Sequence, residues 1–131
     1  MIPDSEWVIQ LVVRPRADEH HRWLTRILAD SHRLLMVVEA DGKPAGSIRL
    51  DRLVDDSRPM CYELAIAVAP SLQGQGIGTA ALRMVRAMMP GAVLDATVLA
   101  ENKPSLALFR NAGFTPVADD VYRSTPIQAL S

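Results

Sequence analysis

The 131-residue sequence has few of the residues that form covalent cross-links or metal sites. It has one cysteine, three histidines and only 5% aromatic residues. A lone Cys61 excludes an internal disulfide and any zinc site built from several cysteines. The histidines, at positions 20, 21 and 32, would bind a metal only together with carboxylates, so we expect no metal. With 49% hydrophobic residues, the chain can form a core without a disulfide or a metal site.

The sequence also lacks a charge excess and a long apolar segment. Fourteen basic and fifteen acidic residues give a net charge of -1, which argues against binding to nucleic acid or to an anionic membrane. Apolar runs such as Leu34–Val38 are far shorter than the ~20 residues that span a bilayer. Met1–Gln10 carries acids and no apolar centre, unlike a signal peptide. We therefore expect a cytoplasmic protein with a single domain over residues 1–131.

Apolar periodicity predicts strands alternating with helices. Helices are expected from Asp18 to about Ser31, over Ile77–Met89 and over Asn102–Asn111. Asp41-Gly42 predicts a hairpin turn between two of the strands. The expected strands are Trp7–Arg14, Leu34–Glu39, Ala45–Leu50, Cys61–Ala69, Ala92–Leu99, Phe114–Ala118 and Val121–Ser124. This order indicates a mixed α/β or α+β fold in which helices pack on a largely antiparallel sheet.

The segment Gln73-Gly-Gln-Gly-Ile-Gly-Thr79 lies between a buried strand and an amphipathic helix. Its three glycines permit positive φ angles and close approach to a ligand. Backbone N–H groups at a helix N-terminus bind phosphate oxygens, so the segment predicts a site for a phosphorylated cofactor. A plain flexible turn is the alternative.

Two other phosphate motifs fit less well. Gly76-x-Gly78-x-x-Ala81 matches the dinucleotide fingerprint, and Asp95 lies near the spacing of the ribose-binding acid. That motif should begin where its strand ends, whereas Ser71–Gln75 intervene here, and no βαβ unit precedes it. A Walker A loop is excluded because no Gly-Lys-Ser/Thr follows.

Two motifs, in order, resemble the GNAT family of N-acetyltransferases. The first is Gln73-Gly74-Gln75-Gly76-Ile77-Gly78, which resembles that family's acetyl-CoA pyrophosphate loop, [RQ]-x-x-G-x-[GA]. The second combines Val98, Asn102, Ser105, Phe109 and Gly113-Phe114 at the expected distance downstream. The resemblance extends from about Val13 to Tyr122. It implies a GNAT-like sheet of six to seven strands, with three or four flanking helices and splayed fourth and fifth strands.

The resemblance also implies which residues bind acetyl-CoA. The splayed strand would bind the pantetheine arm and the thioester oxygen through its backbone, around Ile66 to Val68. Asn102 and Ser105 are candidates for contacts with the pantetheine, although Asn102 is equally explained as a helix cap. The implied cofactor-binding set is Ile66, Ala67, Val68, Gln73, Gly74, Gln75, Gly76, Ile77, Gly78, Thr79, Asn102, Ser105 and Phe109.

Acetyl transfer to an amine needs a base and a stable leaving thiolate. The resemblance makes Glu63 the candidate base; a surface carboxylate is the alternative. Alternation places it on one strand face with the small Ala65 and Ala67. Phe109 stands where the family has a tyrosine acid, which leaves water, Ser105 or Tyr122 to protonate the thiolate. Otherwise Phe109 is a core residue.

The acceptor is expected to be the primary amine of a small molecule. A narrower similarity, around Ala17–Leu24 and Gly46–Asp51, is to acetyltransferases of UDP-linked 4-amino sugars on the pseudaminic and sialic acid routes. It makes His20, Trp23, Arg49 and Asp51 candidate substrate-binding residues, with core or surface roles as the alternatives. Two other functions stay open: an acyl-CoA-binding regulatory domain with weak catalysis, and acetylation of a protein or peptide amine. We expect a monomer or a homodimer.

Overall fold

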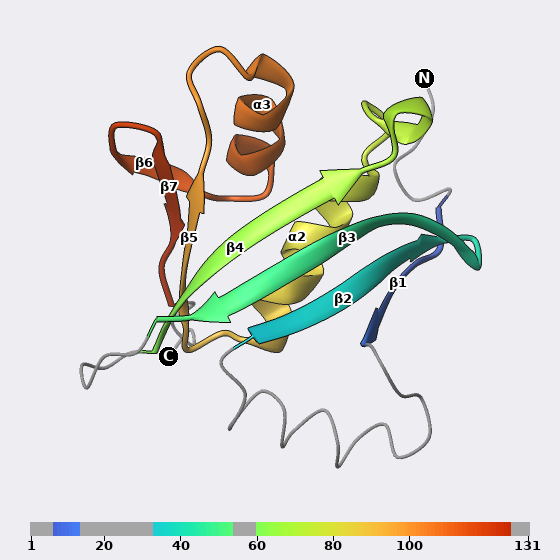
Figure 1. Cartoon of the computed structure of the whole chain (residues 1–131), viewed down its shortest axis with the longest axis horizontal. Coiled ribbons are helices and arrows are strands. Elements are labelled where there is room, and N and C mark those ends of the chain that lie inside the picture. Colours follow the sequence, from blue (N-terminus) through green and yellow to red (C-terminus); the bar gives the residue numbers. More distant parts are fainter. Residues whose placement is uncertain (1–6, 14–32, 54–59, 127–131) are drawn as a thin grey trace, which may run out of the picture.

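The computed structural model describes residues 7–13, 33–53 and 60–126, which form a seven-stranded sheet with two α-helices (Figure 1). The strands are β1 (Ile9–Val13), β2 (Arg33–Ala40), β3 (Lys43–Arg52), β4 (Cys61–Val68), β5 (Val93–Thr97), β6 (Thr115–Ala118) and β7 (Val121–Ser124). The helices are α2 (Ile77–Met88) and α3 (Lys103–Asn111), and a 3-10 turn, η2 (Pro70–Leu72), follows β4. The helix expected from Asp18 to Ser31 lies outside the described residues.

The sheet has the strand order β1-β2-β3-β4-β5-β7-β6. Every neighbouring pair is antiparallel except β4 and β5, which are parallel and are joined through α2. A parallel pair requires a long crossover connection, and the helix with its glycine loop supplies it. The predicted mixed, largely antiparallel fold is therefore confirmed.

The tight turn between β2 and β3 has the backbone that its sequence predicts. Asp41 and Gly42 both have positive φ, 53° and 81°, as a two-residue hairpin turn requires. The Asp41 carboxylate also accepts a hydrogen bond from the Val8 amide at 2.8 Å. This contact holds the start of the chain's first described segment against the turn.

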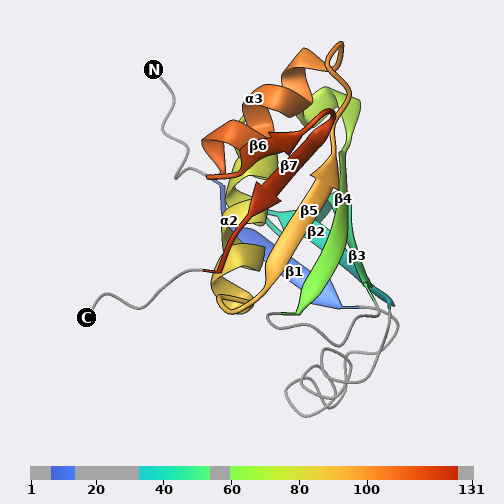
Figure 2. The ribbon, with the colours of Figure 1, turned by 90° about the vertical axis from the view of Figure 1, so that its left-hand side faces the viewer.

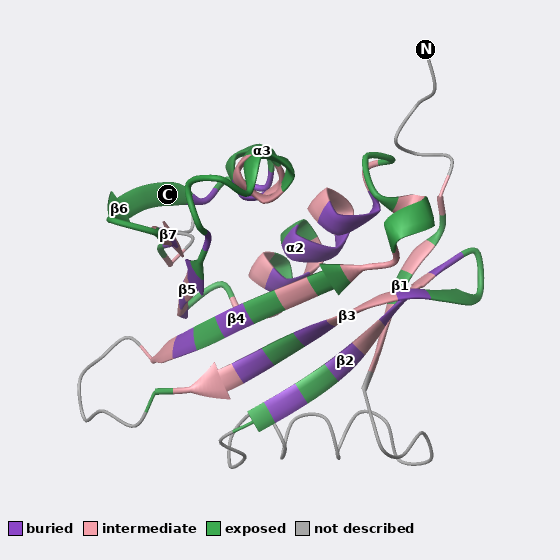
Figure 3. Ribbon diagram, turned by 45° about the horizontal axis from the view of Figure 1, so that its top comes forward, coloured by how far each residue is buried: buried purple, intermediate pink, exposed green. Residues whose placement is uncertain are grey.

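The core lies between the sheet and α2. Alternate residues of β2 are buried, and the buried face of α2 consists of Ile77, Gly78, Ala81, Leu82 and Val85 (Figure 3). In β4 the even-numbered residues Tyr62 and Leu64 face this core, while Glu63, Ala65 and Ala67 are exposed. The expected placement of Glu63 with two small side chains on one strand face is confirmed.

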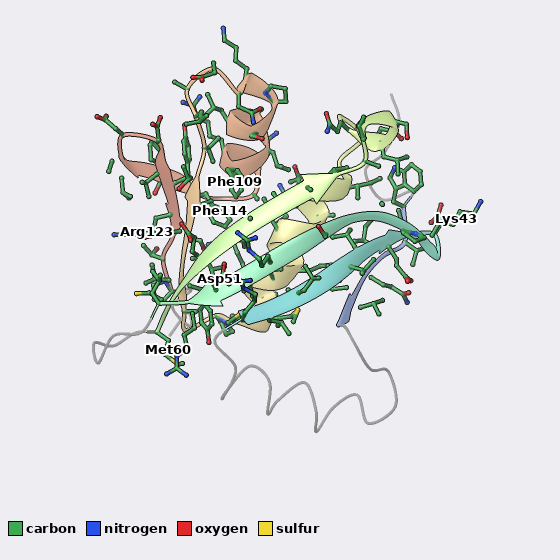
Figure 4. The ribbon with its side chains drawn as sticks, in the orientation of Figure 1. Lys43, Asp51, Met60, Phe109, Phe114 and Arg123 are labelled. Carbon is green, nitrogen blue, oxygen red and sulfur yellow. The ribbon has the colours of Figure 1, made fainter. Side chains whose placement is uncertain are left out.

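Helix α3 lies on the same side of the sheet as α2 (Figure 2). Phe109 of α3 and Phe114, just before β6, are both buried, and their rings meet edge to face with centroids 5.0 Å apart. Figure 4 shows the two rings between α3 and the sheet. The reading of Phe109 as a core residue is therefore confirmed, and its ring anchors α3.

Strands β4 and β5 separate soon after they pair. Their register runs only from Cys61–Val93 to Glu63–Asp95, although β4 continues to Val68 and β5 to Thr97. Beyond Asp95, β5 stays paired with β7 and so leaves β4 (Figure 1). The splayed fourth and fifth strands, which the family resemblance implied, are present.

Candidate active site

Two neighbouring cavities occupy the region where β4 and β5 separate. The larger, which we call the loop cavity, has a volume of about 720 Å³, within the ~300–1,000 Å³ typical of ligand sites. The smaller, which we call the sheet cavity, has about 280 Å³. They share Ile66, Asn102 and Ser105, so they adjoin at the end of the sheet gap nearest α3.

The two cavities have different linings. The loop cavity is lined by Ile66, Ala67, Val68, Leu72, Gln73, Gly74, Gly76, Gly78, Thr79, Arg83, Asn102, Pro104, Ser105, Ala107, Leu108 and Asn111. The sheet cavity is lined by Arg49, Glu63, Leu64, Ala65, Ile66, Thr97, Val98, Asn102, Ser105 and Phe109. The sheet cavity thus receives Glu63 from one face of the sheet and Phe109 from the other.

The glycines of the loop are needed for two different reasons. Gly74 and Gly76 have φ angles of 79° and 85°, a left-handed conformation that most other residues adopt only with strain. Gly78 lies in the first turn of α2, where a Cβ would come within 2.9 Å of a Leu108 methyl carbon and 3.3 Å of one on Val68. Its absent side chain lets α2 approach both α3 and β4.

The first turn of α2 offers free backbone donors to the loop cavity. Gly76 is the N-cap and makes no side-chain cap, and the turn contains no acidic residue. The Gly76 carbonyl already accepts from the Ala80 amide at 3.0 Å, while the first N–H groups of a helix have no intrahelical acceptor. These donors and the helix dipole favour an anion, as the sequence predicts.

The two glutamines of the loop hold its backbone in place. The Gln73 side-chain amide donates to the Val68 carbonyl at 3.0 Å, and that of Gln75 donates to the Ser71 carbonyl at 3.3 Å. Gln73 lines the loop cavity, whereas Gln75 and the buried Ile77 are outside the lining of both cavities. The loop is therefore fastened to the end of β4.

The backbone of β4 faces the sheet gap at every second residue. The Ala69 amide donates to the Ala45 carbonyl at 2.8 Å, which places the odd-numbered residues of β4 in the ladder with β3. The N–H and C=O groups of Ile66 and Val68 consequently point toward the gap, and those of Ala67 toward β3. Ile66 and the N–H group of Val68 can thus bind a ligand in the gap, whereas the Val68 carbonyl already accepts from Gln73.

The start of α3 closes the site on the helix side. Asn102 caps the helix, because its side chain accepts from the Ser105 amide at 3.3 Å. The capping role considered from the sequence is therefore real, and Asn102 nevertheless lines both cavities with Ser105. Phe109 is 3% exposed, lines the sheet cavity and carries no hydroxyl group.

Glu63 lies at the centre of a row of charges across the sheet. Residues in register on successive strands are Arg33 on β2, Asp51 on β3, Glu63 on β4, Asp95 on β5 and Arg123 on β7. Glu63 occupies the last paired position before β4 and β5 separate. Its neighbours on both sides are carboxylates, and each of these is paired with an arginine.

The outer members of the row form tight ion pairs. Arg123 makes two hydrogen bonds to Asp95, at 2.7 and 3.0 Å. Hydrogen bonding to Asp95 raises the pKa of Arg123 above its ordinary value. Asp51 accepts from Arg33 at 2.6 Å and pairs with Arg49 at 3.0 Å. The hydrogen bond from Arg33 holds the pKa of Asp51 below its ordinary value. Among the described residues, no ion pair of this kind involves Glu63.

The remaining candidate residues differ in whether they line a cavity. Arg49 lines the sheet cavity with Glu63, whereas Asp51 is outside its lining and pairs with Arg33 and Arg49 (Figure 4). Tyr122 is buried at 6% exposure and lines neither cavity. His20 and Trp23 lie outside the described residues.

Several lining residues were missed in the sequence. Thr97 ends β5 and Val98 follows it, and both line the sheet cavity only because that strand leaves β4. Arg83 lines the loop cavity one helical turn after Thr79, and the i,i+4 spacing on α2 is the signal that would have found it. Asp95, the candidate acid of a dinucleotide site, instead accepts two hydrogen bonds from Arg123.

The described residues contain neither a membrane-spanning helix nor a cluster of metal ligands. None of the helices found there has the length and apolar character needed to cross a membrane. In the same ranges, no cluster of three or more histidine, cysteine or acidic residues is arranged to bind a metal ion.

Comparisons with known proteins place this arrangement in context. Residues 3–114 match the model of a family described as the acetyltransferase (GNAT) family. A search of curated proteins finds no match.

Solved structures of acetyltransferases have the same fold. Spermidine N-acetyltransferase from Vibrio cholerae, in complex with CoA and spermine, is 20% identical with a TM-score of 0.59, over 84% of this chain and 74% of that one. Aminoglycoside acetyltransferase AAC(6')-Ib, in complex with coenzyme A and kanamycin, is 13% identical with a TM-score of 0.66, over 88% and 95%. The N-acetyltransferase PseH from Campylobacter jejuni is 19% identical with a TM-score of 0.58, over 88% and 94%.

The loop cavity predicts a charge-specific effect at Gly74. An Asp or an Asn tolerates the left-handed conformation better than other side chains, and a Cβ at Gly74 meets nothing within 4 Å. Gly74→Asp should weaken acetyl-CoA binding about tenfold or more through repulsion of the phosphates, whereas Gly74→Asn should change it little. Isothermal titration of both variants measures this. Equal affinities would show that the phosphates bind elsewhere.

The Asp51 ion pairs predict a pH-dependent contribution to stability. Because the pKa of Asp51 is lowered on folding, the pairs stabilise the protein above the carboxyl group's ordinary pKa, and this is lost as the pH falls through the folded value. Asp51→Asn should lower the free energy of unfolding by at most about 1 kcal/mol at pH 7, as for exposed pairs, and by less at pH 3. Urea unfolding at both pH values tests this, with exposed Asp119→Asn as the control. If Asp51→Asn lowers the free energy of unfolding more at pH 3 than at pH 7, this prediction is wrong.

Proposed function

Because the chain belongs to the acetyltransferase (GNAT) family, and so is an acetyl-CoA-dependent acyltransferase, we propose that it transfers acetyl directly to a primary amine of a small molecule. One observation carries this proposal: Glu63 lines the sheet cavity at the point where β4 and β5 separate, next to the loop cavity. A carboxylate then lies where an amine that enters from the open face of the sheet meets a cofactor that enters from the helix side.

Acetyl-CoA occupies both cavities in this proposal. Its pyrophosphate binds the N–H groups from Gly74 to Thr79, and its pantetheine arm lies in the gap against the backbone of Ile66 and Val68. The shared lining by Asn102 and Ser105 supports a continuous path from one cavity to the other. The thioester thus reaches the sheet cavity, where Glu63 lies.

Glu63 is the proposed general base. The neutral amine attacks the thioester carbonyl carbon, and Glu63 takes a proton from the nitrogen directly or through one water. The tetrahedral intermediate then expels the CoA thiolate, which breaks the C–S bond and leaves the acetyl amide. The arginines paired with Asp51 and Asp95 offset the negative charge on both sides of Glu63.

The reaction also develops negative charge on the oxyanion and on the leaving thiolate, which the backbone and either Ser105 or water would stabilise. An N–H group of β4 that points into the gap, at Ile66 or Val68, is positioned to stabilise the oxyanion. Phe109 cannot protonate the thiolate, and the buried Tyr122 lies outside both cavities, so Ser105 or water is the proposed proton donor. A thiol with a pKa near ~8.5 leaves acceptably as a thiolate near neutral pH.

The acceptor we propose is a small amine, with a nucleotide-linked amino sugar as the specific candidate. The sheet cavity, at about 280 Å³, suits a small group, and Arg49 beside Glu63 suits an acceptor that carries phosphate or hydroxyl groups. The structural neighbours include complexes with spermine and kanamycin, which are small amines. The narrower sequence similarity around Gly46–Asp51 favours the amino sugar. We place the enzyme in the cytoplasm as a single-domain monomer or homodimer, without nucleic acid or membrane partners.

A second candidate follows from Phe109. Phe109 stands where the family has a tyrosine, and it has no hydroxyl group to act as an acid. The chain would therefore also suit an acyl-CoA-binding regulatory domain with weak turnover. The two candidate functions are separated by measuring release of free CoA from acetyl-CoA with a panel of amines: UDP-amino sugars, polyamines and a peptide with a free N-terminus. Release with a small amine supports the acetyltransferase, and no release with any amine supports the regulatory domain. Turnover with the peptide alone would instead favour a protein amine as acceptor.

The proposed base predicts a selective loss of turnover. Glu63→Gln should lower kcat at least a hundredfold, the range typical of general-base catalysis, while the Kd for acetyl-CoA stays within twofold. Release of free CoA measures the rate, and titration measures the affinity.

Glu101→Gln is the matched control. This residue is exposed, precedes α3 and lies outside the lining of both cavities, so the same chemical change should leave the rate unaltered. If Glu63→Gln retains the wild-type rate across the pH range, Glu63 is not the base.

A further inference from the structure

The loop cavity contains a single charged side chain. Among its sixteen lining residues, Arg83 alone is charged, and the others are apolar or neutral polar. A ligand with several phosphate charges would gain much from that cation. Arg83, in the middle of α2, is therefore the one lining side chain whose charge can attract such a ligand.

Arg83 lies beyond the loop that receives the pyrophosphate. It follows Thr79 by four residues, so the two lie on one face of α2 about 6 Å apart along the helix axis. The backbone donors of the loop and the Arg83 guanidinium thus form two separate places for anions along one wall of the cavity. A second phosphate group, distinct from the pyrophosphate, fits the second place.

The Arg83 side chain is already oriented at the cavity edge. Its NH2 group donates to the Asn111 carbonyl, the last of α3, at 2.9 Å. This bond directs the exposed side chain toward the end of α3, and because a guanidinium has five N–H donors, others remain for a ligand. Among the described residues, Arg83 forms no ion pair with a carboxylate.

The other arginine of α2 has a different role. Arg86 donates to the Ser124 hydroxyl at 2.6 Å and to the Ala112 carbonyl at 3.1 Å, and it lies outside the cavity lining. It therefore ties α2 to β7 and to the end of α3. Arg86 thus has a structural role, whereas Arg83 lines the cavity and is available to a ligand.

We propose that Arg83 binds the 3′-phosphate on the ribose of CoA and so makes the protein discriminate between CoA and 3′-dephospho-CoA. The proposal rests on acetyl-CoA being the cofactor. It adds a specificity-determining residue outside the glycine loop, and the phosphate it recognises takes no part in the reaction.

The test compares two ligands and four proteins by isothermal titration. Wild type should bind CoA about tenfold more tightly than 3′-dephospho-CoA. Arg83→Gln, which keeps a donor for the Asn111 carbonyl but removes the charge, should bind CoA as weakly as wild type binds 3′-dephospho-CoA, and its affinity for 3′-dephospho-CoA should not change. Arg83→Lys should keep part of the preference. Arg110→Gln, an exposed arginine of α3 outside the cavity lining, should keep all of it.

Each other outcome has a distinct meaning. If Arg83→Gln weakens both ligands equally, Arg83 acts on the pyrophosphate or on the α2–α3 contact, and the proposal is wrong. A preference for CoA that survives in Arg83→Gln would also overturn it. If wild type binds neither ligand, the proposed function itself fails. Thermal unfolding of the unliganded variants identifies a loss of stability, which would lower both affinities together.

Discussion

The site depends on one constraint, which is that β4 and β5 pair over only three positions. Their register ends at Glu63–Asp95, after which β5 remains with β7 and β4 remains with β3. The separation exposes backbone groups of β4 that a continuous sheet would have used, and it opens a path from one face to the other. The same strand then leads into the glycine loop and α2, so the anion site and the gap share one rigid support.

The charges of the sheet are arranged around Glu63. Three carboxylates in register on adjacent strands would repel one another, and the arginines on β2 and β7 offset the two outer ones. This leaves Glu63 as the central carboxylate, on the exposed face and beside small alanine side chains. The features that a proton acceptor requires, access and space, thus come from the sheet register and not from a loop.

Much of the fold could be predicted because its signals are local. The Asp41-Gly42 turn, the apolar stripe of α2 and the glycine loop are each specified by a few neighbouring residues. The residues that sequence reasoning missed depend on tertiary geometry: Thr97 faces a cavity only because β5 diverges, and Arg83 does so only because α3 lies across from it. Asn102 shows that one side chain can both cap a helix and line a site, so those two readings were not exclusive.

The central claim is that the splayed strands and the glycine loop together bind acetyl-CoA. The most direct measurement is the thermal midpoint of the protein with saturating acetyl-CoA, compared with NAD and with ATP. At a hundred times its dissociation constant, a ligand adds ~2.7 kcal/mol to the stability, enough to raise the midpoint by several degrees in a domain of this size. We expect that rise with acetyl-CoA alone. No rise with acetyl-CoA, or an equal rise with ATP, would contradict the account.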